Sequence, residues 1–170
     1  ADLDLRDSDL LSKSISKMLR YSSDLYPARD NVVFKDKDFI GGGILDSIET
    51  WHEVVRTQDH GLLADILDND CVFYSPVVHT PQLGKDVTFL YLSAAAHVFK
   101  EGFRYTKEIV VDKHAVLEFE CEIDGILVNG VDLISLNEQG LIEEFKVMVR
   151  PLKAINILHK KMEEMLQQIS

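Results

Sequence analysis

The sequence predicts an α+β fold in which a curved, mostly antiparallel sheet wraps around helices. Three observations predict this fold. Apolar residues recur mostly at helical spacing from Ile48 to Phe99. From Phe103 the apolar period becomes two, which is typical of strands with one buried face. The segment 152–169 returns to helical spacing, so helices, one strand, a helix and a four-strand meander follow one another.

Length and charge bound the class of protein. The chain has 170 residues and a net charge of −11. This length suits one domain with an appendage, and such a domain folds without disulfides or a metal. The acid excess disfavours nucleic acid and anionic membranes as partners. The chain has two cysteines, which we expect to be reduced thiols. We expect no membrane span, because no apolar run reaches about 20 residues. We find no signal peptide and expect a cytoplasmic protein.

The composition changes near position 48. Residues 1–47 are predicted to form an N-terminal extension and linker, with a helix whose apolar stripe includes Leu10 and Leu19. The triple glycine 41–43 is predicted to be a hinge, because no Lys-Ser/Thr follows it as in a phosphate-binding loop. Residues 48–170 are the predicted functional domain, and positions 49–170 hold 20 acidic and 11 basic side chains.

The elements of the predicted domain follow in order. Two helices open it, and Asp59 can cap the second one. A strand over 71–75 leads through a loop to a helix over 85–99, which Gly102 ends. Four strands are predicted over 103–111, 114–123, 126–136 and 141–149.

Alternation along the strands predicts which residues face the helices. In the strand 103–111 these are Phe103, Tyr105, Ile109 and Val111. The Asp124-Gly125 dipeptide is a strong signal for a two-residue hairpin.

Asp132 is the polar residue that the pattern does not explain. Its predicted same-face neighbours are Ile126, Val128, Gly130, Ile134 and Leu136. A carboxyl among apolar groups tends to be protonated, paired or placed in a cavity. Gly130 is expected to leave room beside it, so Asp132 is a candidate acid/base group at the floor of a pocket. The alternative is an Asp that faces solvent on an edge strand.

Residues from about 48 to 152 resemble the nuclear transport factor 2-like superfamily, which includes ketosteroid isomerase and the SnoaL-like polyketide cyclases. The resemblance rests on the order of several segments: Trp51 to Asp70, Cys71 to Pro76, Leu83-Gly-Lys85, Gly130 to Ile142, and Val147 to Pro151. It implies a cone-shaped, cystatin-like fold with a deep internal pocket and frequent dimerisation through the sheet.

The resemblance also implies roles for particular residues. Steroid isomerases of the family place a protonated Asp where this chain has Asp132. Their tyrosine donor corresponds to Trp51, which cannot act as an acid near neutral pH, and their catalytic base corresponds to Ser75. A serine with no adjacent histidine is no proton shuttle, so two of three roles are missing.

The sequence therefore predicts a domain that binds a hydrophobic small molecule in an apolar pocket. Asp132 would act in a cofactor-independent isomerisation, cyclisation, dehydration or hydrolysis, with loop residue His79 as a candidate partner or a plain surface histidine. The expected ligand-binding residues are Trp51, Phe73, Ser75, Tyr91, Phe119 and Phe145. No metal site is expected, because no metal-ligand spacing of His or Cys occurs. A homodimer is expected, and the alternative function is a non-catalytic dimeric interaction or carrier module.

Overall fold

A computed structural model describes residues 32–35 and 42–169, with side-chain positions for 46–168. The described residues belong to one compact unit, Asn31–Ser170. The helix predicted near Leu10 and Leu19 lies outside the described residues, as does Gly41.

Within this described part, seven strands form one curved sheet in the order β1-β4-β5-β6-β7-β2-β3. Their bounds are β1 Val32–Lys35, β2 Leu67–Tyr74, β3 Gln82–Leu83, β4 Glu101–Val111, β5 His114–Ile123, β6 Ile126–Leu136 and β7 Ile142–Arg150. Strands β4 to β7 form the predicted antiparallel meander. Strands β1 and β2 pair in parallel with β4 and β7, respectively.

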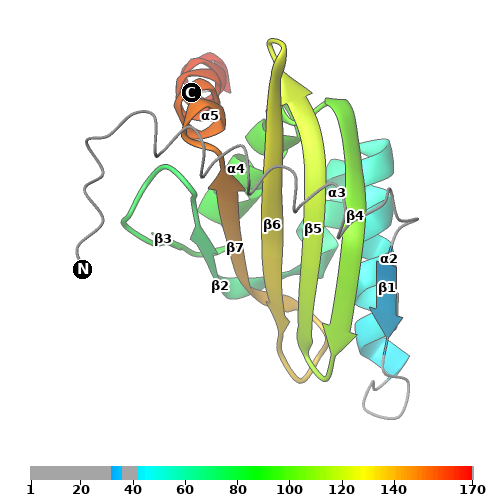
Figure 1. Cartoon of the computed structure of the whole chain (residues 1–170). Helices are drawn as coiled ribbons and strands as arrows, with labels where there is room; N and C mark the ends of the chain where they lie inside the picture. The colour runs from blue at the N-terminus through cyan, green and yellow to red at the C-terminus, as the bar shows by residue number, and fades with distance from the viewer. Residues whose placement is uncertain (1–31, 36–41, 170) are drawn as a thin grey trace, which may run out of the picture. The chain divides into compact units, whose positions relative to one another are not determined.

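The described helices are α2 Gly42–Thr57, α3 His60–Ile66, α4 Lys85–Val98 and α5 Leu152–Ile169. Helices α2, α3 and α4 lie behind the sheet, on its inner face, and α5 crosses near one end of it (Figure 1). The hydrophobic core lies between these helices and the inner face. The predicted α+β class is confirmed, with the sheet wrapped around helices.

Two local signals act as predicted. The Asp59 side chain caps α3 and accepts hydrogen bonds from the Gly61 and Leu62 amides at 2.7 and 3.0 Å. Asp124 and Gly125 join β5 to β6 with φ angles of 49° and 77°. Both angles lie in the left-handed region that a type I′ hairpin requires, which explains why this dipeptide is favoured there.

Two glycine predictions are wrong. Gly42 and Gly43 form the first turn of α2 and are not a hinge. Gly102 does not end α4, which stops at Val98, but lies in β4 with a φ of 62°. The boundary predicted between residues 47 and 48 falls inside α2, and which part of the chain folds independently stays a prediction.

A register shift in β4 reverses part of the predicted alternation. The pairing of β4 with β5 slips between Tyr105 and Lys107, as a β-bulge does. Beyond the bulge, Val110 is fully buried, while Ile109 and Val111 are 38% and 37% exposed. The prediction that Ile109 and Val111 face the helices is therefore wrong. The inserted residue moves every later side chain of β4 to the opposite face.

Both cysteines are free and buried. Cys71 lies on β2, and Cys121 lies on β5. Burial raises the pKa of both thiols, that of Cys121 to about 12. Their thiolate forms are therefore scarce near neutral pH.

Candidate functional site

Asp132 lies on the inner face of β6 and is 5% exposed. Its cross-strand neighbours are Leu117 on β5 and Val147 on β7, both apolar and buried. The alternation of β6 holds along its whole length, which brings the carboxyl to the core side. A carboxyl in this position requires a hydrogen-bond partner, because its desolvation is costly.

That partner is Tyr105, at the end of a short hydrogen-bond chain. The indole Nε1 of Trp51 on α2 donates to the Tyr105 hydroxyl at 2.9 Å. The Tyr105 hydroxyl donates in turn to Asp132 Oδ2 at 2.7 Å. The chain joins α2, β4 and β6 and holds the carboxylate oxygen Oδ2 in a fixed position.

Burial controls the protonation of this group. Desolvation raises the pKa of Asp132 to about 7, although the hydrogen bond from Tyr105 acts to lower it. The pKa of Tyr105 is raised well above its usual value, first by burial and then by the negative charge of Asp132. Tyr105 therefore stays protonated, whereas Asp132 exchanges its proton near neutral pH.

The second carboxyl oxygen, Oδ1, faces a different environment. It has no hydrogen-bond partner among the described residues. Unlike the hydroxyl oxygens of Thr88 and Ser93, it is not fully enclosed by protein atoms. Because Asp132 lines a cavity, Oδ1 is the oxygen that a bound molecule can reach. A protonated Oδ1 can donate a hydrogen bond there, and an ionised one can accept a proton.

The cavity has a volume of about 620 Å³ and extends between α2, the start of α3, α4 and the sheet. This volume is within the usual range for small-molecule sites. Trp51, Phe119 and Phe145 line it, as does Asp132. Ser93 on α4 also lines it, and its buried hydroxyl has no hydrogen-bond partner in the described structure.

The other three predicted ligand-binding residues are not among the lining residues. Phe73 is buried behind the cavity wall, with its ring centre 6.3 Å from that of Phe145. Tyr91 packs on Phe73, because its side of α4 faces β2. Ser75 follows β2, where its hydroxyl accepts a hydrogen bond from the Val77 amide.

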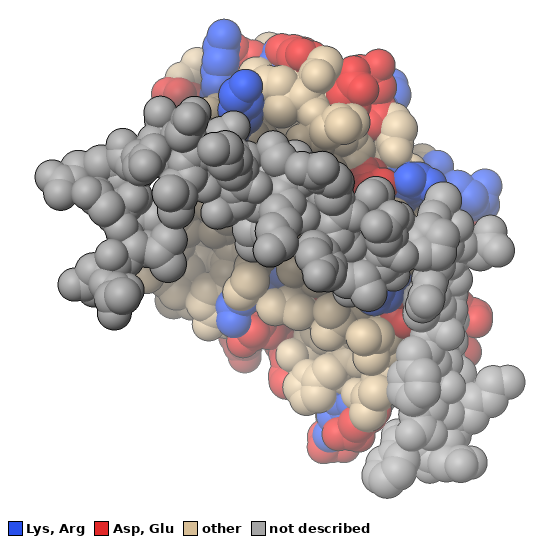
Figure 2. Space-filling view, in the orientation of Figure 1, with Lys and Arg blue, Asp and Glu red and all other residues tan. Residues whose placement is uncertain are grey.

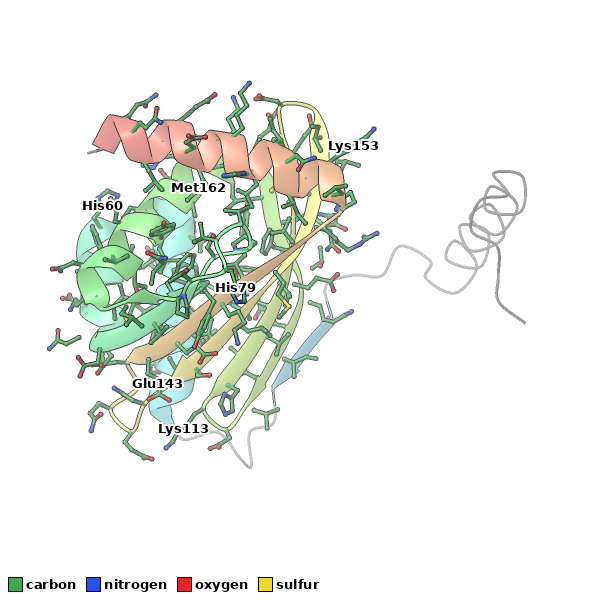
Figure 3. The ribbon with its side chains drawn as sticks, turned by 90° about the vertical axis from the view of Figure 1, so that its left-hand side faces the viewer. His60, His79, Lys113, Glu143, Lys153 and Met162 are labelled. Carbon is green, nitrogen blue, oxygen red and sulfur yellow. The ribbon has the colours of Figure 1, made fainter. Side chains whose placement is uncertain are left out.

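His79 also lies apart from the lining. It is exposed, in the loop between β2 and β3. Figure 3 shows it well separated from His60, which does line the cavity. The structure does not bring His79 to Asp132, because its loop extends from the end of β2 away from the lining elements.

A different histidine borders the cavity. His52 on α2 lies with Nε2 3.1 Å from Glu108 Oε1. Its ring packs edge-on against Tyr105, with ring centres 5.3 Å apart. A histidine oriented by a carboxylate beside a hydrogen-bonded acid is an arrangement that can move protons.

The sequence gives no signal for His52, and for Tyr105 it allows a hydroxyl in the cavity but favours a core or rim aromatic. The bulge in β4 brings Glu108 to the inner side, next to His52, and no signal in the alternating pattern marks that bulge. The inward face of Tyr105 does follow from alternation. Its bond to Asp132, however, depends on how far the curved sheet brings β4 toward β6.

The space expected beside Asp132 at Gly130 is filled. An alanine Cβ at Gly130 would lie 2.3 Å from Phe119 Cζ and 2.8 Å from the Met148 carbonyl oxygen. The Phe119 ring therefore lies directly over this glycine, its cross-strand partner. Gly130 gives room to Phe119 and not to a ligand, so that expectation is wrong.

Two features are absent from the described residues. No group of three or more His, Cys, Asp or Glu side chains in them is placed to hold a metal ion. None of their helices combines the length and the apolar character needed to cross a membrane.

Comparisons with known proteins agree with this fold. A steroid delta-isomerase from Pseudomonas aeruginosa is 30% identical, with a TM-score of 0.73, over 76% of this chain and 96% of that chain. A protein with a cystatin-like fold from Silicibacter pomeroyi is 34% identical, with a TM-score of 0.68, over 72% and 86% of the two chains.

A third structure shares the fold alone. It is a SnoaL-like polyketide cyclase homologue from Shewanella denitrificans, 14% identical with a TM-score of 0.52, over 75% and 99% of the two chains. No protein-family model and no curated protein sequence matches the chain.

Together these define an α+β domain of the cystatin-like class. The chain belongs to the nuclear transport factor 2-like superfamily.

Proposed function

We propose that this chain binds an apolar small molecule in the cavity and that Asp132 exchanges a proton or a hydrogen bond with an oxygen atom of that molecule. The proposal rests on one observation: the two carboxyl oxygens of Asp132 have different surroundings. Oδ2 is held by Tyr105, and Oδ1 borders the cavity without a partner among the described residues. The similar Pseudomonas protein is a steroid delta-isomerase, which supports a ligand with a rigid apolar body.

The reaction class that these groups support best is a cofactor-independent isomerisation by proton transfer. A protonated Asp132 stabilises negative charge that develops on a carbonyl oxygen of the ligand. His52, oriented by Glu108, takes up the proton that one carbon of the ligand releases and returns it to another carbon, so the isomer forms and His52 regains its initial state. Tyr105 and Trp51 hold Asp132 in position through their hydrogen-bond chain.

Binding of a neutral fluorescent probe, N-phenyl-1-naphthylamine, tests the cavity. Trp51 is the single tryptophan and lies in the cavity wall, so its emission reports on occupancy. We expect a Kd of about 10 µM, given a gain of about 0.4 kcal/mol for each probe atom. Ala95→Phe adds a ring to the lining and should weaken binding at least tenfold.

The control is Ala64→Phe, which adds the same ring to α3 outside the lining. It should leave the probe's Kd unchanged. Equal binding of the probe by the wild type and by Ala95→Phe would contradict the proposal. A cooperative thermal transition of Ala95→Phe and of Ala64→Phe shows that both variants are folded.

The outer face of the sheet supports the expected homodimer, which the alternative function, a non-catalytic dimeric interaction or carrier module, also requires. Leu127 is 75% exposed and Met148 is 52% exposed on this face. Figure 2 shows uncharged side chains between acidic and basic groups on it. A hollow of about 390 Å³ includes Met148, Lys107 and Glu118, and the two charged side chains pair with each other at 3.2 Å. Covering this hollow in a two-fold dimer would therefore leave neither of these charges without a partner.

We therefore expect a homodimer formed through this face. Met148→Glu places a charge in the apolar part of the interface and should shift the protein to monomer in sedimentation velocity. Glu163→Gln, on the exposed side of α5, is the control and should leave the sedimentation coefficient unchanged. A wild type that sediments as a monomer at high micromolar concentration would rule out the dimer.

A further inference from the structure

The charges that line the cavity differ in sign from those of the whole domain. Acidic side chains outnumber basic ones by 20 to 11 over positions 49–170. Among the described lining residues, however, Asp132 is the single acid, whereas Arg56, Lys100 and Arg104 are basic. The basic side chains are exposed, and Asp132 is buried. The cavity therefore has an acidic group at its inner end and cationic groups at its mouth.

The three cations are not equivalent. Arg56 pairs with Glu53, and Arg104 pairs with Glu120 at 2.8 Å, so each already has a carboxylate partner. Neither glutamate is a lining residue. Lys100 has no hydrogen bond or ion pair in the described part of the chain. Its ammonium group is thus the uncompensated positive charge at the mouth, and it offers three hydrogen-bond donors.

Lys100 lies just beyond the end of α4, in the short connection from Val98 to β4. Ser93 and Ala96 are spaced as i and i+3 on one side of α4. All three residues border the cavity, from the buried Ser93 to the exposed Lys100. The lining between the two ends is mainly apolar and includes Leu92, Ala95 and Phe99. A molecule that fills the cavity therefore contacts the Asp132 carboxyl at the inner end, then apolar side chains, then the Lys100 ammonium group at the mouth.

We propose that the ligand is an amphiphilic organic anion, whose apolar body lies against the aromatic wall and whose carboxylate, sulfonate or phosphate group binds Lys100 at the mouth. This inference rests on the proposed small-molecule function and names the chemical class of the ligand. A neutral oxygen atom at the other end of the ligand meets Asp132 Oδ1. A second carboxylate at that inner end is disfavoured, because it would face the Asp132 carboxyl.

A matched pair of probes tests the class of ligand with the full-length chain. N-phenyl-1-naphthylamine is neutral, and 8-anilinonaphthalene-1-sulfonate has the same apolar body with one sulfonate added. The ratio of their two Kd values isolates the contribution of the anion. In the wild type we expect the sulfonate probe to bind more tightly at low salt. Its advantage should shrink as NaCl rises from about 0.05 to about 0.5 M, since exposed charges are screened.

Lys100→Gln removes the charge and keeps most of the side chain. We expect it to weaken binding of the sulfonate probe about fivefold and to leave the Kd of the neutral probe unchanged. The control is Lys153→Gln, an exposed lysine on α5 that is not a lining residue and that Figure 3 shows at the end of that helix. It should change neither Kd.

The outcomes separate the two proposals. Suppose that the neutral probe binds and that Ala95→Phe abolishes its binding, but that Lys100→Gln weakens the two probes equally or weakens neither. The proposal of an anionic ligand is then wrong, and the proposed binding of a small molecule in the cavity stands. If neither probe binds, or if Ala95→Phe affects neither, the cavity function fails and the ligand class with it. A fivefold loss confined to the sulfonate probe supports both.

Discussion

The Asp132→Asn variant is expected to resist unfolding better than the wild type at pH 8, by about 4 kcal/mol. The folded protein holds the pKa of Asp132 at about 7, against an ordinary value of 3.8. Ionising the buried carboxyl therefore opposes folding. Asparagine has no charge to desolvate, and its carbonyl oxygen can still accept the hydrogen bond from Tyr105.

The sign of the pH dependence follows from the order of the two pKa values. Below about pH 4 the carboxyl is protonated in both states, so the variant gains nothing there. As the pH rises, the unfolded chain ionises first, and the wild type loses stability relative to the variant until the pH passes about 7. Each pH unit in this window contributes about 1.4 kcal/mol, so the difference should grow by about 2.5 kcal/mol from pH 5 to pH 8.

Urea denaturation followed by Trp51 emission at pH 5, 6, 7 and 8 measures this difference. Asp65→Asn is the matched control, because Asp65 is an exposed carboxylate on α3 with no described partner. Its free energy of unfolding should track that of the wild type at every pH. A difference for Asp132→Asn that does not change with pH would mean that the carboxyl is not perturbed.

Gly130→Ala is expected to destabilise the fold by about 3 kcal/mol. The new Cβ would lie 2.3 Å from Phe119 Cζ and 2.8 Å from the Met148 carbonyl oxygen. Phe119 is 1% exposed, so its ring has little room to move, and the carbonyl belongs to the paired backbone of β7. Overpacking of this kind costs about 1–3 kcal/mol or more.

The sign of the change in the free energy of unfolding shows whether the new Cβ clashes with its neighbours. Without a clash, alanine in place of glycine within a strand should stabilise the protein by about 0.5–1 kcal/mol, because the unfolded chain loses freedom. A double-mutant cycle with Phe119→Leu identifies the neighbour responsible. Gly130→Ala should cost less when leucine replaces the ring, and additive effects would show that Phe119 does not cause the clash.

The fold was predictable because most of its signals are local. The Asp59 cap, the Asp124-Gly125 turn and the alternation of β6 each depend on a few neighbouring residues. The inward position of Asp132 follows from that alternation alone. These are the features on which propensity, pattern and tertiary packing agree.

The rest of the site depends on geometry that the pattern does not encode. One extra residue in β4 brings Glu108 inward to His52 and turns Ile109 outward. The bond from Tyr105 to Asp132 links strands that are not neighbours in the sheet, so it needs the curvature as well as the register. Phe73 and Tyr91 were expected in the wall, but Phe145 lies in front of Phe73 there.

The two buried thiols make local opening of the fold measurable. Cys71 lies on β2, beside the parallel pair with β7, and Cys121 lies on β5, in the meander. A disulfide reagent reaches either sulfur only while the surrounding structure is open, so each labelling rate reports how readily its own region opens. Single-cysteine variants would thus show whether β2 opens more readily than the meander that holds Asp132.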